Sequence, residues 1–399
     1  RRVGAAIARA TRGLGTVLTP VATDAGPAGV QALTEGYLLG AYRHPSARTT
    51  DPAPGPAETL MLLGRHDQDA VDRATRAALA TWTARVLTVT PSDVKSPTWL
   101  ADRAQELGEA AGLVVERVEA ARLAELGFGG ILAVGGGSAT PPCLVTLRYE
   151  PSGATLPRHV VVVGKGITYD TGGLSIKPRE SMTSMKTDMA GAAVALATVV
   201  GAAQAKVPHR VTAVLPLAEN AVGASSYRPG DVLHTYGGTS VEIANTDAEG
   251  RIVLADALAH ADRDLDPDVL IDVATLTGAA TLGLGRQHGA LYTGDDALAG
   301  SLTAAGEEAG ERLWRMPLVE DYLPALDSLV ADLRHVPAEV KGGGSITAAL
   351  FLRAFVGRRR WAHLDIAGPA RAGSAAHEVP EGATGFGARV LLAWLDRLR

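Results

Sequence analysis

Short apolar runs alternate with longer alanine-rich segments along most of the chain. Residues 160–163 are four consecutive valines, and residues 270–274 and 362–366 are similar apolar runs. Residues 189–200 and 252–261 are longer and mix alanine with larger apolar residues, which favours helices. A continuous β-branched run is typical of a strand covered on both faces. The alternation predicts an α/β fold with a central mixed, largely parallel sheet sandwiched by helices.

The first part of the chain predicts a smaller α/β unit. A basic, alanine-rich helix over 1–14 is followed by a strand over 15–20 and a second strand near 60–65. Residues 67–88 predict a long helix that links this unit to the rest. We therefore expect a smaller N-terminal domain at 1–66, a linking helix at 67–88 and a larger α/β domain at 89–399.

The segment after the linking helix predicts a loop, a helix and a strand within residues 90–118. A short helix over 120–126 and a short strand over 131–134 follow, and then a strand over 143–149.

Two acidic residues lie close together in the stretch NTDAEGR, residues 245–251. Asp247 and Glu249 stand where a strand-like run gives way to a helix-like run. In an extended segment, residues two apart point to the same side, so the two carboxylates can converge. Arg251 falls in the first helical turn, where free N–H groups and the helix dipole favour an anion. Such an arrangement is costly unless a cation lies between the carboxylates.

A second charged cluster lies upstream. The valine run leads into glycines and then presents Lys165, Asp170 and Lys177 from loop backbone, while Asp188 precedes the helix at 189–200. In open α/β sheets, ligands bind outside the carboxyl ends of the strands. The two clusters are therefore expected to meet there.

The charge balance of these residues indicates metal ions. Four carboxylates held together repel one another by about 4 kcal/mol per pair at ~4 Å and an effective dielectric of ~20. Two divalent cations would balance them. Near such cations the pKa of Lys165, ordinarily about 10.4, should fall, so that the neutral amine can act as a ligand. Lys177 could stay protonated and polarise a substrate carbonyl. Oxygen-rich ligation without His or Cys favours Mn²⁺ or Mg²⁺, with Zn²⁺ as an alternative.

Several motifs together resemble the leucyl aminopeptidase (cytosol aminopeptidase) family, bacterial type. The resemblance extends from about residue 80 to the end, with the motifs in family order. It rests on NTDAEGR, GKGITYDTGGLSIKP (164–178), MKTDMAGAA (185–193), LPLAENAVGASSYRPGDVL (215–233), ATLTGA (274–279) and GGGSITAALFL (342–352).

The resemblance implies a site for two metal ions. Lys165, Asp170, Asp188 and Glu249 match the family's ligands to the more tightly held ion. Asp170, Asp247 and Glu249 match the ligands to the more exchangeable ion, with Asp170 and Glu249 bridging. The activity implied is release of the first residue of a peptide by water activated between the ions.

The resemblance also implies roles for residues around the metals. Lys177 and Arg251 match the family's catalytic lysine and arginine, and the arginine is thought to hold a bicarbonate as general base. Met185, Thr275 and Gly278 match residues that line the pocket for the first side chain. A methionine among small neighbours makes an adaptable apolar pocket, which favours leucine and similar residues.

Composition restricts the remaining possibilities. The chain has 399 residues, 46% hydrophobic and only 4% aromatic, so its core must consist mainly of Ala, Val and Leu. The formal net charge is −5 without a basic stripe, and no nucleic-acid partner is predicted. One cysteine, Cys143, excludes an internal disulfide and suits a reducing cytoplasm. We expect a cytoplasmic protein that acts on peptides, without a run of ~18 apolar residues for a membrane helix or a signal-peptide pattern.

The family resemblance implies a homo-hexamer, and three features of the chain depart from it. Val89 and His335 stand where the family usually has Asn, and we expect them to affect packing or subunit contacts rather than chemistry. The sequence starts at Arg1 without an initiating methionine. We expect the first strands of the family's N-terminal domain to be missing from it, which would make residues 1–66 the least stable part.

Two other functions stay open. The same ion cage could serve a two-metal hydrolase of phosphoesters or of non-peptide amides. A metal-free scaffold is the other alternative, and the intact set of ligands argues against it. A phosphate-binding loop is excluded at GKG (164–166), because His159 occupies the required glycine position and no Ser or Thr follows Lys165.

Overall fold

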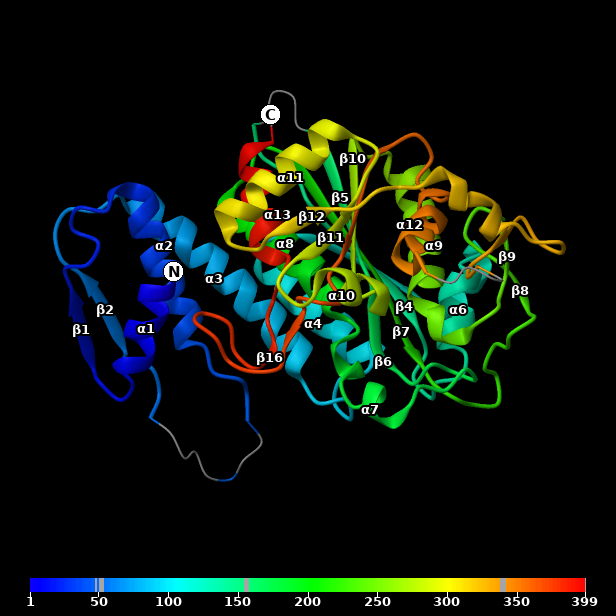
Figure 1. Cartoon of the computed structure of the whole chain (residues 1–399), viewed down its shortest axis with the longest axis horizontal. Coiled ribbons are helices and arrows are strands. Elements are labelled where there is room, and N and C mark those ends of the chain that lie inside the picture. Colours follow the sequence, from blue (N-terminus) through cyan, green and yellow to red (C-terminus); the bar gives the residue numbers. More distant parts are fainter. Residues whose placement is uncertain (47–48, 50–53, 154–157, 338–341, 399) are drawn as a thin grey trace.

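The computed structural model describes residues 1–46, 49, 54–153, 158–337 and 342–398. Its main body is built on a sheet with the strand order β12-β11-β14-β10-β5-β7-β4-β3, and β6 pairs with β7 beside this path (Figure 1). The strands are β3 (Val114–Glu119), β4 (Cys143–Tyr149), β5 (His159–Gly164), β6 (Gly166–Asp170), β7 (Arg210–Asn220), β10 (Val269–Ala274), β11 (Gly289–Tyr292), β12 (Leu313–Arg315) and β14 (Arg360–Asp365).

The centre of this sheet is parallel. Strands β14, β10, β5 and β7 run in one direction, with Val162 beside Ile271 on β10 and Ala213 on β7. The edges are mixed, since β4 is antiparallel to β7, β3 to β4, and β11 to β14. The predicted mixed, largely parallel sheet is therefore confirmed.

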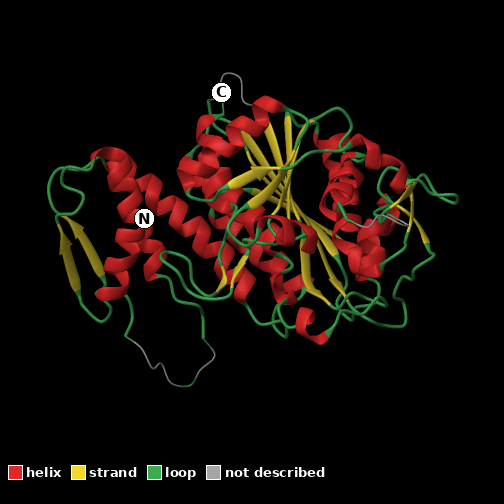
Figure 2. Ribbon diagram, in the orientation of Figure 1, coloured by secondary structure: helices red, strands yellow, loops and turns green. Residues whose placement is uncertain are grey.

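Helices cover both faces of the sheet (Figure 2). One layer contains α3 (Gln68–Val89), α4 (Pro97–Ala110), α8 (Ala190–Ala205), α11 (Asp296–Ala309) and α13 (Ala388–Arg397). The other contains α6 (Gly129–Gly135), α9 (Glu249–His260) and α12 (Gly344–Arg353). The remaining short helices are α5 (Ala120–Leu126), α7 (Arg179–Met182), α10 (Gly278–Leu284), the 3₁₀ turns η1 (Met185–Thr187), η2 (Thr246–Ala248) and η4 (Glu320–Leu326), and the π turn η3 (Ala261–Leu265).

The body also contains a three-stranded and a two-stranded sheet, apart from the central one. They are formed by β8 (Val232–His234), β9 (Ser240–Glu242) and β13 (Leu333–Arg334), and by β15 (Arg371–Ala372) with β16 (Gly382–Ala383).

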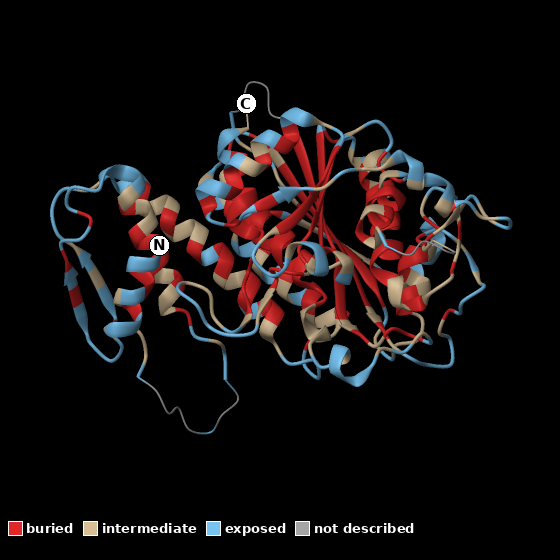
Figure 3. Cartoon of the chain, viewed as in Figure 1, coloured by how far each residue is buried: buried red, intermediate tan, exposed pale blue. Residues whose placement is uncertain are grey.

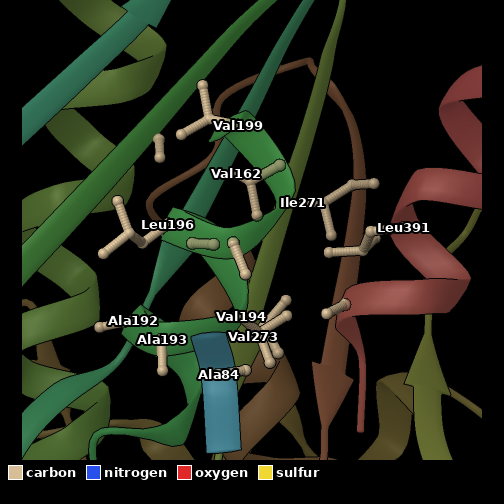
Figure 4. Close-up of a cluster of buried hydrophobic side chains, with 14 of the residues drawn as sticks. Ala84, Val162, Ala192, Ala193, Val194, Leu196, Val199, Ile271, Val273 and Leu391 are labelled. Atoms are coloured by element: carbon tan, nitrogen blue, oxygen red, sulfur yellow. The ribbon is translucent and has the colours of Figure 1, made fainter. Parts of the chain in front are cut away.

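The valine run shows why the sheet needs both layers. Val160 and Val162 belong to the core under α8 and α13, whereas Val161 and Val163 belong to the core under α9 and α12. All four are at most 1% exposed, so each contributes about 1.5–3 kcal/mol of apolar burial. Figure 3 shows the sheet buried between its helices, and Figure 4 shows Val162 and Ile271 among the side chains of α8 and α13.

Helix α8 lies close against the sheet because its residues are small. A Cβ on Gly191 would come within 2.1 Å of the Val273 carbonyl oxygen, so glycine is required there. The segment Met185–Ala205 has a mean hydropathy of 1.3 and is long enough to span a membrane, contrary to the expectation of no such run. However, 78% of its apolar window is buried inside the protein, as in a core helix.

The N-terminal unit contains a two-stranded parallel sheet. It consists of α1 (Arg2–Ala10), β1 (Thr16–Thr19), α2 (Gly26–Ala41) and β2 (Thr59–Leu62). Helix α1 is shorter than predicted, whereas the strands and the long helix α3 are confirmed. The Asp67 side chain caps α3 by accepting from Ala70 N at 3.1 Å. Arg389 of α13 forms a buried ion pair with Glu35 of α2 at 2.7 Å, which joins this unit to the body.

One predicted strand is wrong. Residues 131–134 belong to α6, where Ile131 and Val134 lie three residues apart on one face and are both buried. A four-residue apolar run cannot be assigned by periodicity alone. The glycines around it decide the matter, because Gly130 lies so close to α9 that a Cβ would meet the Ile252 oxygen at 2.7 Å.

Candidate metal and catalytic site

The predicted charged residues gather at the carboxyl edge of the parallel strands. Lys165 directly follows β5, Asp170 is the last residue of β6, and Thr275 directly follows β10. Asp188 lies between η1 and α8. The strands end at one edge because they are parallel, so residues distant in sequence meet there.

Asp247 and Glu249 converge as predicted, but on a different backbone. The segment is not extended: Asp247 lies in η2, and Glu249 is the first residue of α9. The Asn245 side chain starts the turn by accepting from Asp247 N at 2.9 Å. Carboxylate oxygens of Asp170, Asp247 and Glu249 all lie within 4.8 Å of one another, which is a distance that one metal ion can bridge.

Lys165 is buried among the other predicted ligands. Its Nζ lies 2.8 Å from Asp188 Oδ2 and 2.9 Å from Glu249 Oε1, and donates to the Thr275 carbonyl oxygen at 3.1 Å. Burial alone would lower the pKa of Lys165, but the carboxylates of Asp188, Glu249 and Asp170 outweigh it and raise the pKa. The predicted fall in this pKa concerns the ion-filled site and stays a prediction.

Lys177 reaches the same cluster from a tight loop. Its Nζ lies 2.8 Å from Asp170 Oδ2 and also pairs with Asp247. The loop turns back at Gly172, whose φ of +85° favours glycine; a Cβ there would come within 2.5 Å of the Ser175 carbonyl oxygen. Burial opposes the charge of Lys177, but Asp170 and Glu249 raise its pKa.

The carboxylates outnumber the lysines around them. Burial raises the pKa of Asp188 and Asp247, and burial followed by the charge of Glu249 raises that of Asp170. Four carboxylates against two ammonium groups leave two negative charges at full ionisation. Glu249 is 1% exposed, and its Oε2 has no hydrogen-bond partner in the described part of the chain. The donor set therefore fits divalent cations, which favour the ionised carboxylates.

Two residues that the sequence did not single out hold the ligands in place. Asn220 ends β7, and its Nδ2 donates to Asp170 Oδ1 at 2.8 Å and to the Thr246 carbonyl oxygen at 3.0 Å. Thr246 Oγ1 donates to the Gly172 carbonyl oxygen at 2.7 Å and accepts from Ser175 N. The position of Asn220 at a strand end was the available signal, but its partners depend on the tertiary fold.

Arg251 is buried in the first turn of α9. Its Nη1 donates to the His335 carbonyl oxygen at 2.7 Å, while Nε has no partner among the described residues. Burial lowers the pKa of Arg251 to about 10, with Glu249 opposing the effect. His335 therefore lies closer to the chemistry than expected, because it contacts the predicted catalytic arginine directly.

A cavity of about 390 Å³ opens over the ligands. Met185, Thr275 and Gly278 line it as predicted, together with Ala367 and Ala370. Thr275 has a second contact, since its hydroxyl donates to Asp188 Oδ1 at 2.7 Å. The site therefore combines an acidic cluster that could hold metal ions, two lysines and a partly apolar pocket.

A family model and similar sequences both relate this chain to the cytosol aminopeptidases. Residues 82–392 match the model of the cytosol aminopeptidase family, catalytic domain. A probable cytosol aminopeptidase of Rhodococcus opacus is 44% identical over 398 residues, which cover 97% of this chain and 76% of that protein. One from Chlorobaculum tepidum is 41% identical over 374 residues, covering 90% of this chain and 73% of that protein.

Solved structures agree with these relatives. The bottromycin maturation enzyme BotP in complex with Mn superposes with a TM-score of 0.93 at 41% identity, covering 99% of this chain and 86% of that one. A leucine aminopeptidase of Caenorhabditis elegans superposes with a TM-score of 0.85 at 31% identity, covering 96% of this chain and 76% of that one.

Proposed function

This chain belongs to the cytosol aminopeptidase family, and on that premise we propose that it releases leucine and other apolar residues from the N-termini of peptides. The broader activity follows from the family: the chain is a metal-dependent aminopeptidase of the leucyl aminopeptidase type. The preference for apolar first residues is supported by Met185 and the small residues beside it in the cavity.

Five residues would hold two metal ions. Lys165, Asp170, Asp188 and Glu249 would hold one ion, and Asp170, Asp247 and Glu249 the other. Mn²⁺ or Zn²⁺ at these positions would supply an acidified water and polarise the peptide carbonyl. The support is the short distances within this group and the buried, unpartnered oxygen of Glu249.

Lys177 and Arg251 would perform the remaining catalytic roles. Lys177 would donate a hydrogen bond to the oxygen that becomes negative when the carbonyl is attacked. Its ammonium lies at the cavity next to Asp170, which supports this role. Arg251 would hold a bicarbonate-like anion as the general base, and its position in the first turn of α9 with an unpartnered Nε supports that role.

The convergence of the acidic ligand atoms within 4.8 Å is the observation that carries the proposal. We expect hydrolysis of leucine p-nitroanilide in the presence of Mn²⁺ and two equivalents of metal per chain by elemental analysis. Asp247→Ala and Glu249→Ala should lose both the bound metal and the activity. Asp296→Ala is the matched control, since its side chain is 89% exposed on α11. Unchanged hydrolysis in the two site variants would overturn the proposal.

A phosphoester substrate is the rival for the same ion cage. Turnover of leucine amide and of p-nitrophenyl phosphate should be compared in Mn²⁺ with the same protein. We expect turnover of the amide alone, because the cavity offers an apolar pocket beside the metal ligands. Faster turnover of the phosphoester would instead support the rival function.

The division into a partial N-terminal domain (1–66), a linking helix (67–88) and a catalytic domain (89–399) is part of the proposal, as are a cytoplasmic location and a homo-hexamer. Light scattering of the purified chain should give the mass of six subunits, and a monomer would contradict this expectation.

A further inference from the structure

The active-site cavity extends past the metal ligands to two arginines. Arg286 follows α10, and Arg371 is the first residue of β15; both line the same cavity as Asp170 and Lys177. The four acidic residues predicted as metal ligands also line this cavity. The arginines provide basic groups elsewhere in the same cavity.

The Arg286 side chain reaches the backbone of Arg371, and the charge of Arg286 acts on the Arg371 guanidinium. Arg286 Nη1 donates to the Arg371 carbonyl oxygen at 3.4 Å. Burial, followed by the charge of Arg286, lowers the pKa of Arg371. No carboxylate of a described residue lies within ion-pairing distance of either guanidinium. Two neighbouring cations without an acid between them repel each other, and an anion would relieve this repulsion.

The acidic residues that line the cavity do not form ion pairs with these two arginines. Asp170, Asp188, Asp247 and Glu249 pair with Lys165 and Lys177 instead. Other arginines of the chain do pair with nearby acids. For example, Arg359 pairs with both Asp262 and Asp266.

We propose that Arg286 and Arg371 bind a carboxylate of the peptide substrate, so that the enzyme favours peptides with a negative charge close to the N-terminus. The inference rests on the proposed function, since it places the free amine of the peptide at the metal cage of the same cavity. The carboxylate has two sources: the free C-terminus of a dipeptide, or an acidic side chain on the first or second residue. Guanidinium groups suit either source because they bind carboxylates with paired hydrogen bonds.

The contribution should appear in KM rather than in kcat. The arginines would contact a part of the substrate that does not change during hydrolysis, so the ground state and the transition state gain equally. Partly exposed pairs of this kind change affinity by about threefold to tenfold. The preference should also weaken as salt is added, because Arg286 is exposed and Arg371 is only half-buried.

The experiment compares each acidic substrate with a neutral isostere on the Mn²⁺-loaded enzyme. The pairs are Leu-Gly against Leu-Gly-amide, Leu-Asp-amide against Leu-Asn-amide, and Glu-amide against Gln-amide. The first pair reports the C-terminal carboxylate, the second an acidic second residue, and the third an acidic first residue. We expect the wild type to favour the acidic member of at least one pair by about threefold to tenfold in kcat/KM.

Substitution then tests whether the arginines are responsible. Arg286→Gln combined with Arg371→Gln should bring that ratio to about one through a rise in KM for the acidic substrate. Arg358→Gln is the matched control; Arg358 is also exposed, but it precedes β14 at the end opposite Asp365. This control should keep the ratio of the wild type.

Two results would overturn the inference: no preference in any of the three pairs, or a preference that the double variant retains. Leucine amide separates this failure from failure of the proposed function. If the wild type hydrolyses leucine amide but ignores substrate charge, the aminopeptidase assignment stands and only the role of the arginines falls. If leucine amide is not hydrolysed, the proposed function itself is wrong.

Discussion

Arg251 and His335 are joined through the backbone, with Arg251 Nη1 donating to the His335 carbonyl oxygen at 2.7 Å. The imidazole of His335 also contacts the segment that carries Asp247. Its Nε2 lies 2.8 Å from the Asn245 carbonyl oxygen, and its Nδ1 accepts from Ala244 N at 3.3 Å. A neutral ring with its proton on Nε2 satisfies these two contacts, while Nδ1 also lies 3.1 Å from the Glu242 carbonyl oxygen. One buried residue therefore contacts both the arginine, through its carbonyl oxygen, and the start of the acidic turn, through its ring.

The buried position of the His335 ring predicts that the free energy of unfolding falls in acid. Burial, reinforced by the charge of Arg251, lowers the pKa of His335 to about 4, compared with about 6.5 in an unfolded chain. Between these values the unfolded state binds more protons, so stability is complete above pH ~6.5 and is lost as the pH falls toward ~4. The full loss is about 3 kcal/mol, at 1.36 kcal/mol per pKa unit.

His335→Asn removes the titrating ring and should remove this part of the acid sensitivity. The measurement is the difference in unfolding free energy between wild type and variant at pH 7.5 and at pH 4.5. The difference should shift in favour of the variant at the lower pH. Parallel curves for the two proteins would show that His335 does not titrate as expected.

Gly250 should be intolerant of even one added methyl group. A Cβ at this position would lie 2.4 Å from Lys165 Cε and 2.6 Å from Lys165 Nζ, so Gly250→Ala must displace the buried ammonium. A ligand displaced by about 1 Å costs on the order of 10²-fold in rate. We expect that loss in kcat/KM for leucine p-nitroanilide, together with less bound metal by elemental analysis.

Gly300→Ala provides the control for that substitution. Gly300 is an exposed residue of α11, and its added Cβ would meet nothing within 4 Å. This variant should keep full activity and gain about 0.4–1 kcal/mol of stability. Equal activity of both alanine variants would contradict the assigned position of Lys165.

Lys177→Met should reduce the chemical step more than substrate binding. Loss of one donor to a developing oxyanion lowers kcat by about 10²–10³-fold, and KM should change little. Steady-state kinetics with leucine amide would separate the two constants. The control is Lys206→Met at the exposed end of α8. A large rise in KM with unchanged kcat would assign Lys177 to substrate binding alone.

Lys95 should stabilise the connection between the linking helix and the pocket. Its Nζ donates to the Thr88 carbonyl oxygen at 2.8 Å, to that of Leu87 at 3.2 Å and to that of Lys186 at 2.5 Å. The first two belong to the last turn of α3, where carbonyl groups lack helical partners. Lys95→Met leaves all three carbonyls unsatisfied and should cost roughly 2–4 kcal/mol.

Denaturant unfolding would measure that loss. Lys186→Met serves for comparison, because Lys186 is partly exposed and its Nζ donates to a single carbonyl oxygen, that of Val89, at 2.8 Å. Its cost should stay near 1 kcal/mol or below. Equal costs for the two variants would show that the three hydrogen bonds of Lys95 stabilise the protein no more than the single one of Lys186.

Much of the acidic site could be predicted from the sequence because its residues lie in short motifs at strand ends. Lys165 follows a valine strand, and Asp247 and Glu249 stand at the start of a helix, so the topology of a parallel sheet brings them together. The charge excess of these residues then indicated cations without knowledge of any distance.

The remaining features depend on contacts that no local pattern encodes. The turn at Asp247 is helical rather than extended, since Asn245 caps it. The pairing of Arg286 with Arg371 joins the end of α10 to β15, which lie far apart in sequence. The short apolar run 131–134 lies in a helix whose flanking Gly130 allows it to approach α9 closely, and periodicity does not report such an approach.

The strand order has a consequence for the kinetics of folding. The residues around the cavity come from β5, β6, β10 and the start of α9, and the central strands pair with partners distant along the chain. Such non-local pairing forms slowly, and the cage is complete only after the central strands have aligned. An ion bound there would therefore prolong the lifetime of the native state without hastening its formation.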